Sequence, residues 1–287
     1  MSQALNQGLG TKQAIDVRLL PARQSKSARP RREDLELKLA ALQQDYADLH
    51  TAIFEAAQVH RRLCAPRLLR FGDFELASEI FAVRSLPGDF FTVEGAGEGV
   101  VLALGDICGK GLAAGMWTPH LVSLVRTHTT PDSEPEVIMS GVNRDICRTP
   151  ILGPTASLFL GKLDPITGLL TYCSAGHPPA FLLRANGSLE SLSEGGLLLG
   201  VLADATYTRG FCQLHRGDML LVYSDGITES RNTSGDEFGY ERLEVQMRQA
   251  QSGSADAALF SVLGAVQDFA GTRPLLDDMS LAVIRRD

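Results

Sequence analysis

The sequence predicts an α+β protein: an antiparallel sandwich with helical layers, preceded by a long amphipathic helix. Its strand-like segments lie in hairpins and its helical segments come in consecutive pairs, an order that argues against an alternating βαβ sheet. A change of pattern after residue 32 and the proline at position 66 divide the chain further. We expect a basic leader (1–32), an amphipathic helix (33–66) and a globular domain (67–287).

The leader carries seven Lys or Arg and one Asp, although the whole chain has a net charge of −7. Because it lacks aromatic residues and any repeated basic spacing, we expect a solvated, disordered tail. An arm that binds nucleic acid or a partner is the alternative. The rest of the chain is acidic, which is unfavourable for binding phosphate backbones, so we expect no nucleic-acid partner.

Composition and cysteine usage bound the class of protein. Hydrophobic residues make up 44% of the chain and charged residues 21%, as in ordinary globular proteins. No apolar run is long enough to cross a bilayer, and the N-terminus lacks the apolar core of a signal peptide, so we expect no membrane association. Five cysteines without a Cys-x-x-Cys pair indicate reduced thiols and therefore a cytoplasmic protein.

The amphipathic helix has apolar positions at alternating spacings of four and three. This heptad seam of period 3.5 favours a coiled coil, and we expect the helix at 35–63 to form a homodimer. A single helix packed on its own domain is the alternative, for which a wider stripe and a period nearer 3.6 are typical. The seam consists of Leu35, Leu39, Leu42, Tyr46, Leu49, Ile53, Ala56, His60 and Leu63.

The remaining elements follow from apolar periodicity and turn residues. Helical spacing predicts helices over 111–127, 134–148, 240–251 and 255–270. Turn chemistry at 164–168 and 185–187 separates three strands of the central part. The last two strands before residue 224 are expected to pair with each other around 215–217. Strands are predicted at 74–83, 99–104, 157–163, 169–174, 180–184, 206–214, 218–223 and 279–285.

Five carboxylates lie at the ends of strand-like segments, and three of them have a glycine directly beside them. Carboxylates in such positions, with glycines that let the backbone approach closely, provide the oxygen ligands that hard divalent cations require. Two such ions would activate a water for attack on phosphorus, and the sequence shows no P-loop or nucleophile elbow. We therefore predict a two-metal hydrolytic centre formed by Asp89, Asp106, Asp225, Asp277 and Asp278.

Seven motifs occur in one order along residues 50–287. In this order they resemble the metal-dependent PPM/PP2C-type serine phosphatases, in particular the bacterial SpoIIE/RsbU-like branch. One motif alone is a weak signal, whereas the ordered set is specific. The motifs are Gly88-Asp-Phe-Phe, Gly105-Asp-Ile-Cys-Gly-Lys-Gly, Ser174-Ala-Gly-His-Pro-Pro, Gly217-Asp, Tyr223-Ser-Asp-Gly-Ile-Thr-Glu, Phe238-Gly-Tyr-Glu-Arg-Leu and Asp277-Asp-Met-Ser.

The resemblance implies a four-layer αββα sandwich with two Mn²⁺ or Mg²⁺ ions between the sheets. By motif, Asp106 would bridge both ions and the Ile107 carbonyl would add an oxygen. Asp225 and Asp277 would complete the shell of one ion, and Asp89 would serve the other.

Three further positions bear on the predicted site. Asp278 stands where related phosphatases have Asn or Asp, and we include it among the metal ligands. Lys110 occupies a position often held by His or another polar residue, and as a point charge it would contact the substrate phosphate. The helix beginning near Gly111 would also hold phosphate at its positive end. His177, which precedes two prolines, is expected to be a structural turn residue rather than a ligand or an acid, and a hydrogen bond from it into the site is left open.

The resemblance implies a cytoplasmic protein-serine/threonine phosphatase. Its substrate would be a phosphorylated regulatory protein, a STAS-type anti-sigma-factor antagonist. An activator protein is left open, because no residue points to one. The alternative is an inactive phosphatase-like module that binds phosphorylated regulators. A diguanylate cyclase, suggested by Pro87-Gly-Asp-Phe-Phe, fits poorly because an acidic residue of that enzyme's signature is absent.

Overall fold

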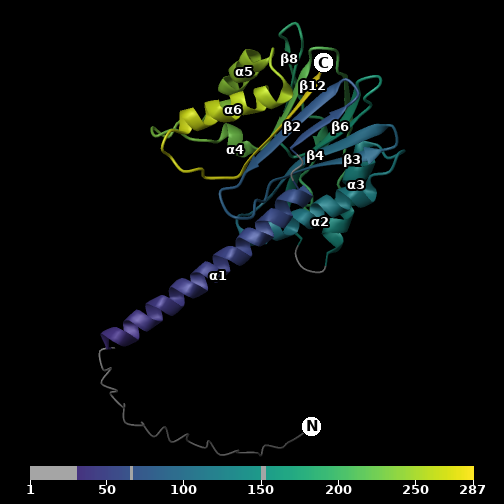
Figure 1. The fold of residues 1–287 in the computed structure, drawn as a ribbon. Coiled ribbons are helices and arrows are strands. Elements are labelled where there is room, and N and C mark those ends of the chain that lie inside the picture. The colour runs from purple at the N-terminus through teal and green to yellow at the C-terminus, as the bar shows by residue number, and fades with distance from the viewer. Residues whose placement is uncertain (1–30, 65–66, 150–152) are drawn as a thin grey trace, which may run out of the picture. The chain divides into compact units, whose positions relative to one another are not determined.

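A computed structural model describes residues 31–64, 67–149 and 153–287, so the predicted disordered leader lies almost wholly outside the described residues. The chain forms two units that divide within the first helix, between Asp48 and Leu49. In the second unit, two mainly antiparallel sheets pack face to face with helices on their outer faces (Figure 1). The α+β four-layer prediction is therefore confirmed.

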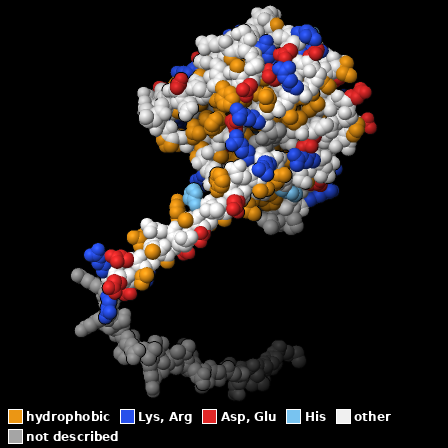
Figure 2. Space-filling view, viewed as in Figure 1, with side chains coloured by type: hydrophobic (Ala, Val, Ile, Leu, Met, Phe, Trp, Pro, Cys, Tyr) orange, Lys and Arg blue, Asp and Glu red, His pale blue; other side chains and the backbone are white. Residues whose placement is uncertain are grey.

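Helix α1 spans Arg32–Cys64. Its early seam positions, such as Leu35 and Leu42, are exposed, and hydrophobic side chains line this part of the helix in Figure 2. Near its end the helix buries His60 and Cys64 against the domain, where they are 6% and 1% exposed. The sequence placed His60 on the dimer seam, and that assignment is wrong, because the turn containing His60 packs on its own domain.

The first sheet has the strand order β1-β2-β12-β11-β7-β8, and all of its pairs are antiparallel. Its central strands are apolar on both faces, as expected for a layer covered on each side. The strands are β1 (Leu68–Phe71), β2 (Phe74–Phe81), β7 (Ala180–Leu183), β8 (Leu189–Leu192), β11 (Met219–Tyr223) and β12 (Met279–Arg286).

The second sheet has the order β10-β6-β5-β4-β3, and the short β9 pairs with β6 in parallel. Its strands are β3 (Phe90–Ala96), β4 (Gly99–Ile107), β5 (Ala156–Leu163), β6 (Leu169–Ala175), β9 (Gly195–Gly196) and β10 (Gly210–Gln213). The inner faces of the two sheets enclose one core, which includes Phe91, Phe159 and Leu220.

Helices cover the outer faces (Figure 1). The second sheet packs on α2 and α3, and the first packs on α5 and α6. Each interface has its own apolar core, so the molecule has three core layers between four structural layers. The helices are α2 (Leu112–His128), α3 (Pro135–Arg148), α4 (Asp225–Thr228), α5 (Gly239–Ala250) and α6 (Ala255–Ala270). No helix within the described ranges is long and apolar enough to span a membrane.

One predicted pairing is wrong. The strands on either side of 215–217 belong to different sheets, because β10 pairs with β6 and β11 pairs with β7 and β12. Five residues, 214–218, are long enough to cross the roughly 10 Å between packed sheets. The crossing is fixed by Asp218, which is buried and accepts hydrogen bonds from Arg184 Nη1 (2.8 Å), the Ala185 N–H (2.9 Å) and the His215 N–H (2.9 Å).

We expect Asp218→Ala to lower the free energy of unfolding by about 3 kcal/mol, because it leaves three donors unsatisfied, one of them a partly buried guanidinium. Urea unfolding followed by circular dichroism measures this. Glu190→Gln is the matched control, since Glu190 pairs with the same Arg184 at 2.6 Å from a side chain that is 46% exposed. It should change stability by less than about 1 kcal/mol; equal effects would contradict the role of Asp218.

Candidate metal centre

Asp89 and Asp106 are brought together by neighbouring strands. Asp89 directly precedes β3 and Asp106 lies near the end of β4, and the pairing of Phe90 with Gly105 continues the register to these two aspartates. A Cβ on Gly88 would lie 3.4 Å from Asp106 Oδ1 and 3.3 Å from the Ile107 carbonyl oxygen. One edge of the second sheet therefore gathers two carboxylates and one carbonyl.

The other carboxylates come from the first sheet. Asp225 begins α4 directly after β11, and Asp277 and Asp278 directly precede β12, the antiparallel neighbour of β11. The chain is crowded here: a Cβ on Gly226 would lie 2.0 Å from the Asp278 carbonyl oxygen. Only glycine allows this approach, which explains the Asp-Gly pair at 225–226.

Burial and mutual repulsion dominate the electrostatics of the cluster. Burial, followed by the charge of Asp106, raises the pKa of Asp89 well above its usual range. Burial, followed by the charge of Asp225, raises the pKa of Asp106 to about 7. The pKa of Asp225 is also raised, by burial and then by Asp277. Aspartates of one sheet therefore change the pKa values of aspartates of the other sheet, and the five predicted residues form one electrostatic cluster.

Asp278 has a distinct place in this cluster. Its Oδ1 accepts a hydrogen bond from the Val83 N–H (2.7 Å) and its Oδ2 accepts one from the Gly88 N–H (2.8 Å). Both oxygens therefore hold the segment that leads to Asp89. This arrangement fits a residue that positions the loop, and each oxygen keeps a second lone pair for a cation, so the predicted ligand role of Asp278 stays a prediction.

One cation borders the carboxylates, and a second lies beside Gly111. Lys110 Nζ lies 2.5 Å from Asp277 Oδ2 and donates to the Leu276 carbonyl (3.1 Å). Arg84 was missed by the sequence analysis: a Cβ on Gly111, the residue before α2, would lie 2.7 Å from Arg84 Nη1. In the sequence, Arg84 is the one charged residue in the mainly apolar segment before Gly88. That pattern alone does not distinguish a functional arginine from an ordinary surface arginine.

The donor set fits divalent cations. Within the described ranges, no three His, Cys, Asp or Glu side chains are already arranged to hold a metal ion. Asp89 is nevertheless 1% exposed, and its Oδ2 has no partner of good hydrogen-bonding geometry among the described residues, although the nearby Ser224 and Ser280 hydroxyls act to lower the pKa of this carboxyl. A buried acceptor without a donor is unfavourable, as are repelling carboxylates, and a bound cation would relieve both. All of these ligands are oxygens, which suits Mg²⁺ or Mn²⁺.

Solved structures confirm the fold. The SiaA-PP2C domain of Pseudomonas aeruginosa has a TM-score of 0.73 at 16% identity, over 86% of this chain and 100% of that one. The catalytic domain of the serine threonine protein phosphatase PstP, solved with two manganese ions, has a TM-score of 0.53 at 16% identity, over 74% of this chain and 97% of that one. The architecture is therefore that of the PP2C-type phosphatases.

Sequence comparison identifies the family. The family model described as Stage II sporulation protein E (SpoIIE) matches residues 96–287, and the chain belongs to that family. The phosphoserine phosphatase RsbU of Bacillus subtilis is 25% identical over 245 residues, 83% of this chain and 71% of RsbU. Protein IcfG of Synechocystis is 29% identical over 188 residues, 56% of this chain and 30% of IcfG.

The raised pKa of Asp106 gives a pH-dependent prediction for the protein in EDTA. The folded-state pKa of about 7 exceeds the usual 3.8, so the folded protein binds more protons between these values. The contribution of Asp106 to the free energy of unfolding therefore falls as the pH rises from about 4 to about 7. Asp106→Asn removes that loss, and we expect the variant to be roughly 1 to 3 kcal/mol more stable than wild type at pH 8.

Urea unfolding of both proteins at several pH values measures this difference. It should be smallest near pH 4, where both side chains are uncharged. A stability difference that is constant from pH 4 to pH 8 would show that neither burial nor neighbouring charge raises the pKa of Asp106.

Proposed function

We propose that this protein is a metal-dependent phosphatase that hydrolyses phosphoserine or phosphothreonine on a regulatory protein. The observation that carries the proposal is the convergence of carboxylates from both sheets, with a buried Asp89 oxygen that lacks a donor of good geometry among the described residues. Membership of the SpoIIE family and the likeness to RsbU support it.

In this proposal Asp106, the Ile107 carbonyl, Asp225 and Asp277 bind two Mn²⁺ or Mg²⁺ ions together with Asp89. Bound ions would supply an activated water and neutralise charge on the phosphoryl group. Asp278 holds the loop before Asp89 through its two backbone hydrogen bonds. A metal-activated water makes a covalent nucleophile unnecessary, and the residues of the site act by holding charges in fixed positions around the phosphoryl group.

The substrate phosphate would lie beside Arg84, Lys110 and the N-terminus of α2. An arginine fork offers paired donors to phosphate oxygens, and Lys110 adds a point charge. A pocket of about 220 Å³ adjoins this place and includes Lys110, Glu229, Arg231 and Asp277. Residues flanking the phosphoserine would enter this pocket.

The partner we propose is a phosphorylated STAS-type anti-sigma-factor antagonist, on the basis of family membership. We also propose a cytoplasmic location. All five cysteines are free thiols, as expected in a reducing compartment.

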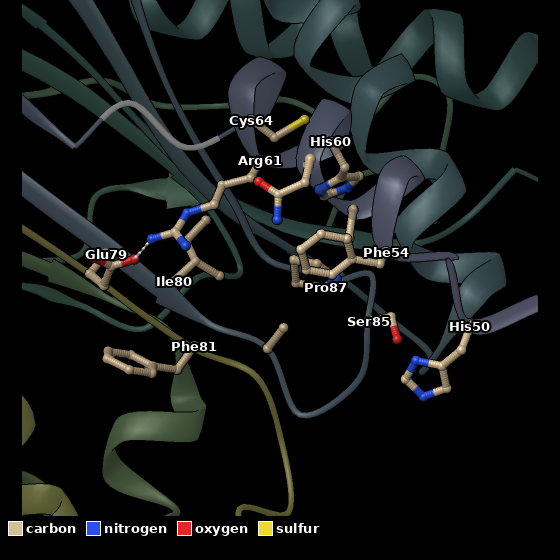
Figure 3. A pocket seen from close by; sticks show the side chains of 13 residues that line it. His50, Phe54, His60, Arg61, Cys64, Glu79, Ile80, Phe81, Ser85 and Pro87 are labelled. Atoms are coloured by element: carbon tan, nitrogen blue, oxygen red, sulfur yellow. Dashed lines mark hydrogen bonds and ion pairs between the residues drawn. The ribbon is translucent and has the colours of Figure 1, made fainter. Parts of the chain in front are cut away.

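We further propose that α1 forms a homodimer and couples the dimer to the metal centre. The end of α1 contributes Phe54 and His60 to a pocket of about 400 Å³, whose other wall includes Ser85 and Pro87 from the loop before Asp89 (Figure 3). An ion pair between Arg61 and Glu79 (2.7 Å) joins the helix to β2. A shift of α1 would therefore reach the loop that Asp278 holds.

Phosphate release from a phosphoserine peptide tests the activity. We expect turnover with Mn²⁺ or Mg²⁺, none with EDTA, and a loss of about 100-fold or more in Asp106→Asn, because one ligand would serve both ions. Folded wild-type protein that binds Mn²⁺ without turnover would favour the alternative of a phosphopeptide-binding module.

Arg84→Gln should raise KM for the phosphopeptide by about 10- to 100-fold, the effect of losing one charged hydrogen bond. Mn²⁺ affinity should stay unchanged, since Arg84 is not a ligand. Arg216→Gln is the control, because Arg216 is an exposed arginine that pairs with Asp73. Equal KM values for Arg84→Gln and wild type would remove Arg84 from the substrate site.

Leu42→Glu in the full chain should weaken dimerisation by about 10-fold or more in sedimentation equilibrium, because it places a charge in the apolar seam. Leu37→Glu is the matched control, since Leu37 is 71% exposed and lies off the seam. Wild-type protein that is monomeric throughout would contradict the dimer. Unchanged turnover and oligomeric state after removal of residues 1–62 would contradict the coupling.

A further inference from the structure

We propose that Ser157 and His177 form a buried positioning pair that fixes Asp106 relative to Asp225, and so sets the affinity of the metal centre. This inference rests on the proposed function. It gives a role to a histidine that the sequence analysis interpreted as a structural turn residue.

Ser157 stands directly beside Asp106. The two residues are cross-strand partners in the β4–β5 ladder. Side chains of directly opposed residues lie on the same face of a sheet, with Cβ atoms about 5 Å apart. Ser157 Oγ lies 2.8 Å from His177 Nδ1, so the imidazole is connected to the neighbour of the proposed bridging carboxylate.

The position of His177 is fixed by its own turn. Ser174 Oγ accepts a hydrogen bond from the His177 N–H and donates one to the His177 carbonyl, both at 3.3 Å. Gly176 adopts a positive φ of 62° that lets the chain turn directly after β6. The side chain is 6% exposed, so the ring has little freedom to leave Ser157.

The other side of the ring faces the first sheet. Burial lowers the pKa of His177 to about 3, against an opposing effect of the nearby Tyr223 carbonyl, so the ring is neutral at working pH. Nε2 has no partner of good hydrogen-bonding geometry among the described residues. A neutral ring has one N–H, and we assign it to Nε2, towards Tyr223, which leaves Nδ1 to accept from the Ser157 hydroxyl.

The Ser157 hydrogen bond and the approach of the ring to the Tyr223 backbone place His177 between the two halves of the centre. Tyr223 ends β11, two residues before Asp225, whereas Ser157 pairs with Asp106 in the other sheet. Two ions about 3.5–4 Å apart require carboxylates at a fixed separation. A buried side chain that holds the two sheets at that separation therefore controls how well the carboxylates bind the two ions. Partners that orient metal ligands change metal affinity by about 10- to 100-fold when removed.

Mn²⁺ binding to the full-length protein, measured by calorimetry and by electron paramagnetic resonance, tests this role. We expect Ser157→Ala and His177→Gln each to weaken Mn²⁺ binding by about 10-fold or more. The double variant should be no weaker than the worse single variant, because the pair acts as a unit. Ser157→Thr keeps the hydroxyl and should restore Mn²⁺ affinity to within about 3-fold of wild type, since loss of the hydrogen bond is the proposed cause.

Asn143→Ala is the control that separates a loss of ligand positioning from a general loss of protein stability. Asn143 is 1% exposed and bonds to the Leu202 carbonyl (2.8 Å) and the Gly200 N–H (2.9 Å), on the helix side of the same sheet. It should lower thermal stability and leave Mn²⁺ affinity within about 2-fold of wild type. Mn²⁺ affinity that falls in parallel with stability in all variants would overturn the inference.

Two results distinguish failure of this inference from failure of the proposed function. Unchanged Mn²⁺ affinity in Ser157→Ala and His177→Gln, with normal binding by wild type, would overturn the positioning role alone. Absence of Mn²⁺ binding by folded wild-type protein would overturn the proposed metal centre and this inference with it.

Discussion

The burial of several carboxylates close together is the constraint on which the rest of this structure depends. Asp89 and Asp106 come from one sheet and Asp225 from the other, and their pKa values rise because burial and neighbouring charge both disfavour ionisation. Such a cluster persists only where a rigid scaffold holds it. Three apolar core layers supply that rigidity and offset the unfavourable electrostatics, which a bound cation would reverse.

The scaffold holds the cluster through backbone contacts as much as through side chains. Gly226 lies against the Asp278 carbonyl, and Gly88 lies against Asp106 and the Ile107 carbonyl. Asp278 then ties the segment before Asp89 to β12 by two backbone hydrogen bonds. Since the end of α1 borders the same loop, the proposed dimer helix and the proposed metal centre share this loop.

Much of the fold was predictable because its signals are local. Apolar periodicity located the helices α2, α3, α5 and α6, and the carboxylates at strand ends predicted the acidic cluster that both sheets form. Two predictions failed for non-local reasons. The short segment 214–218 was predicted to be the turn of a hairpin. It crosses between the sheets instead, because the buried Asp218 accepts hydrogen bonds from the turn after β7 and from the crossing itself. His60 fits a heptad in sequence but packs on its own domain.

The sequence by itself determined the fold class, the family and the set of acidic residues, because apolar periodicity and the order of the motifs depend only on the positions of residues along the chain. Only the tertiary structure decided which residues meet. Arg84 beside Gly111, both Asp278 oxygens on the loop before Asp89, and Ser157 between Asp106 and His177 are contacts between distant segments. Sheet register and backbone approach create such contacts, and neither has a signature in local residue spacing.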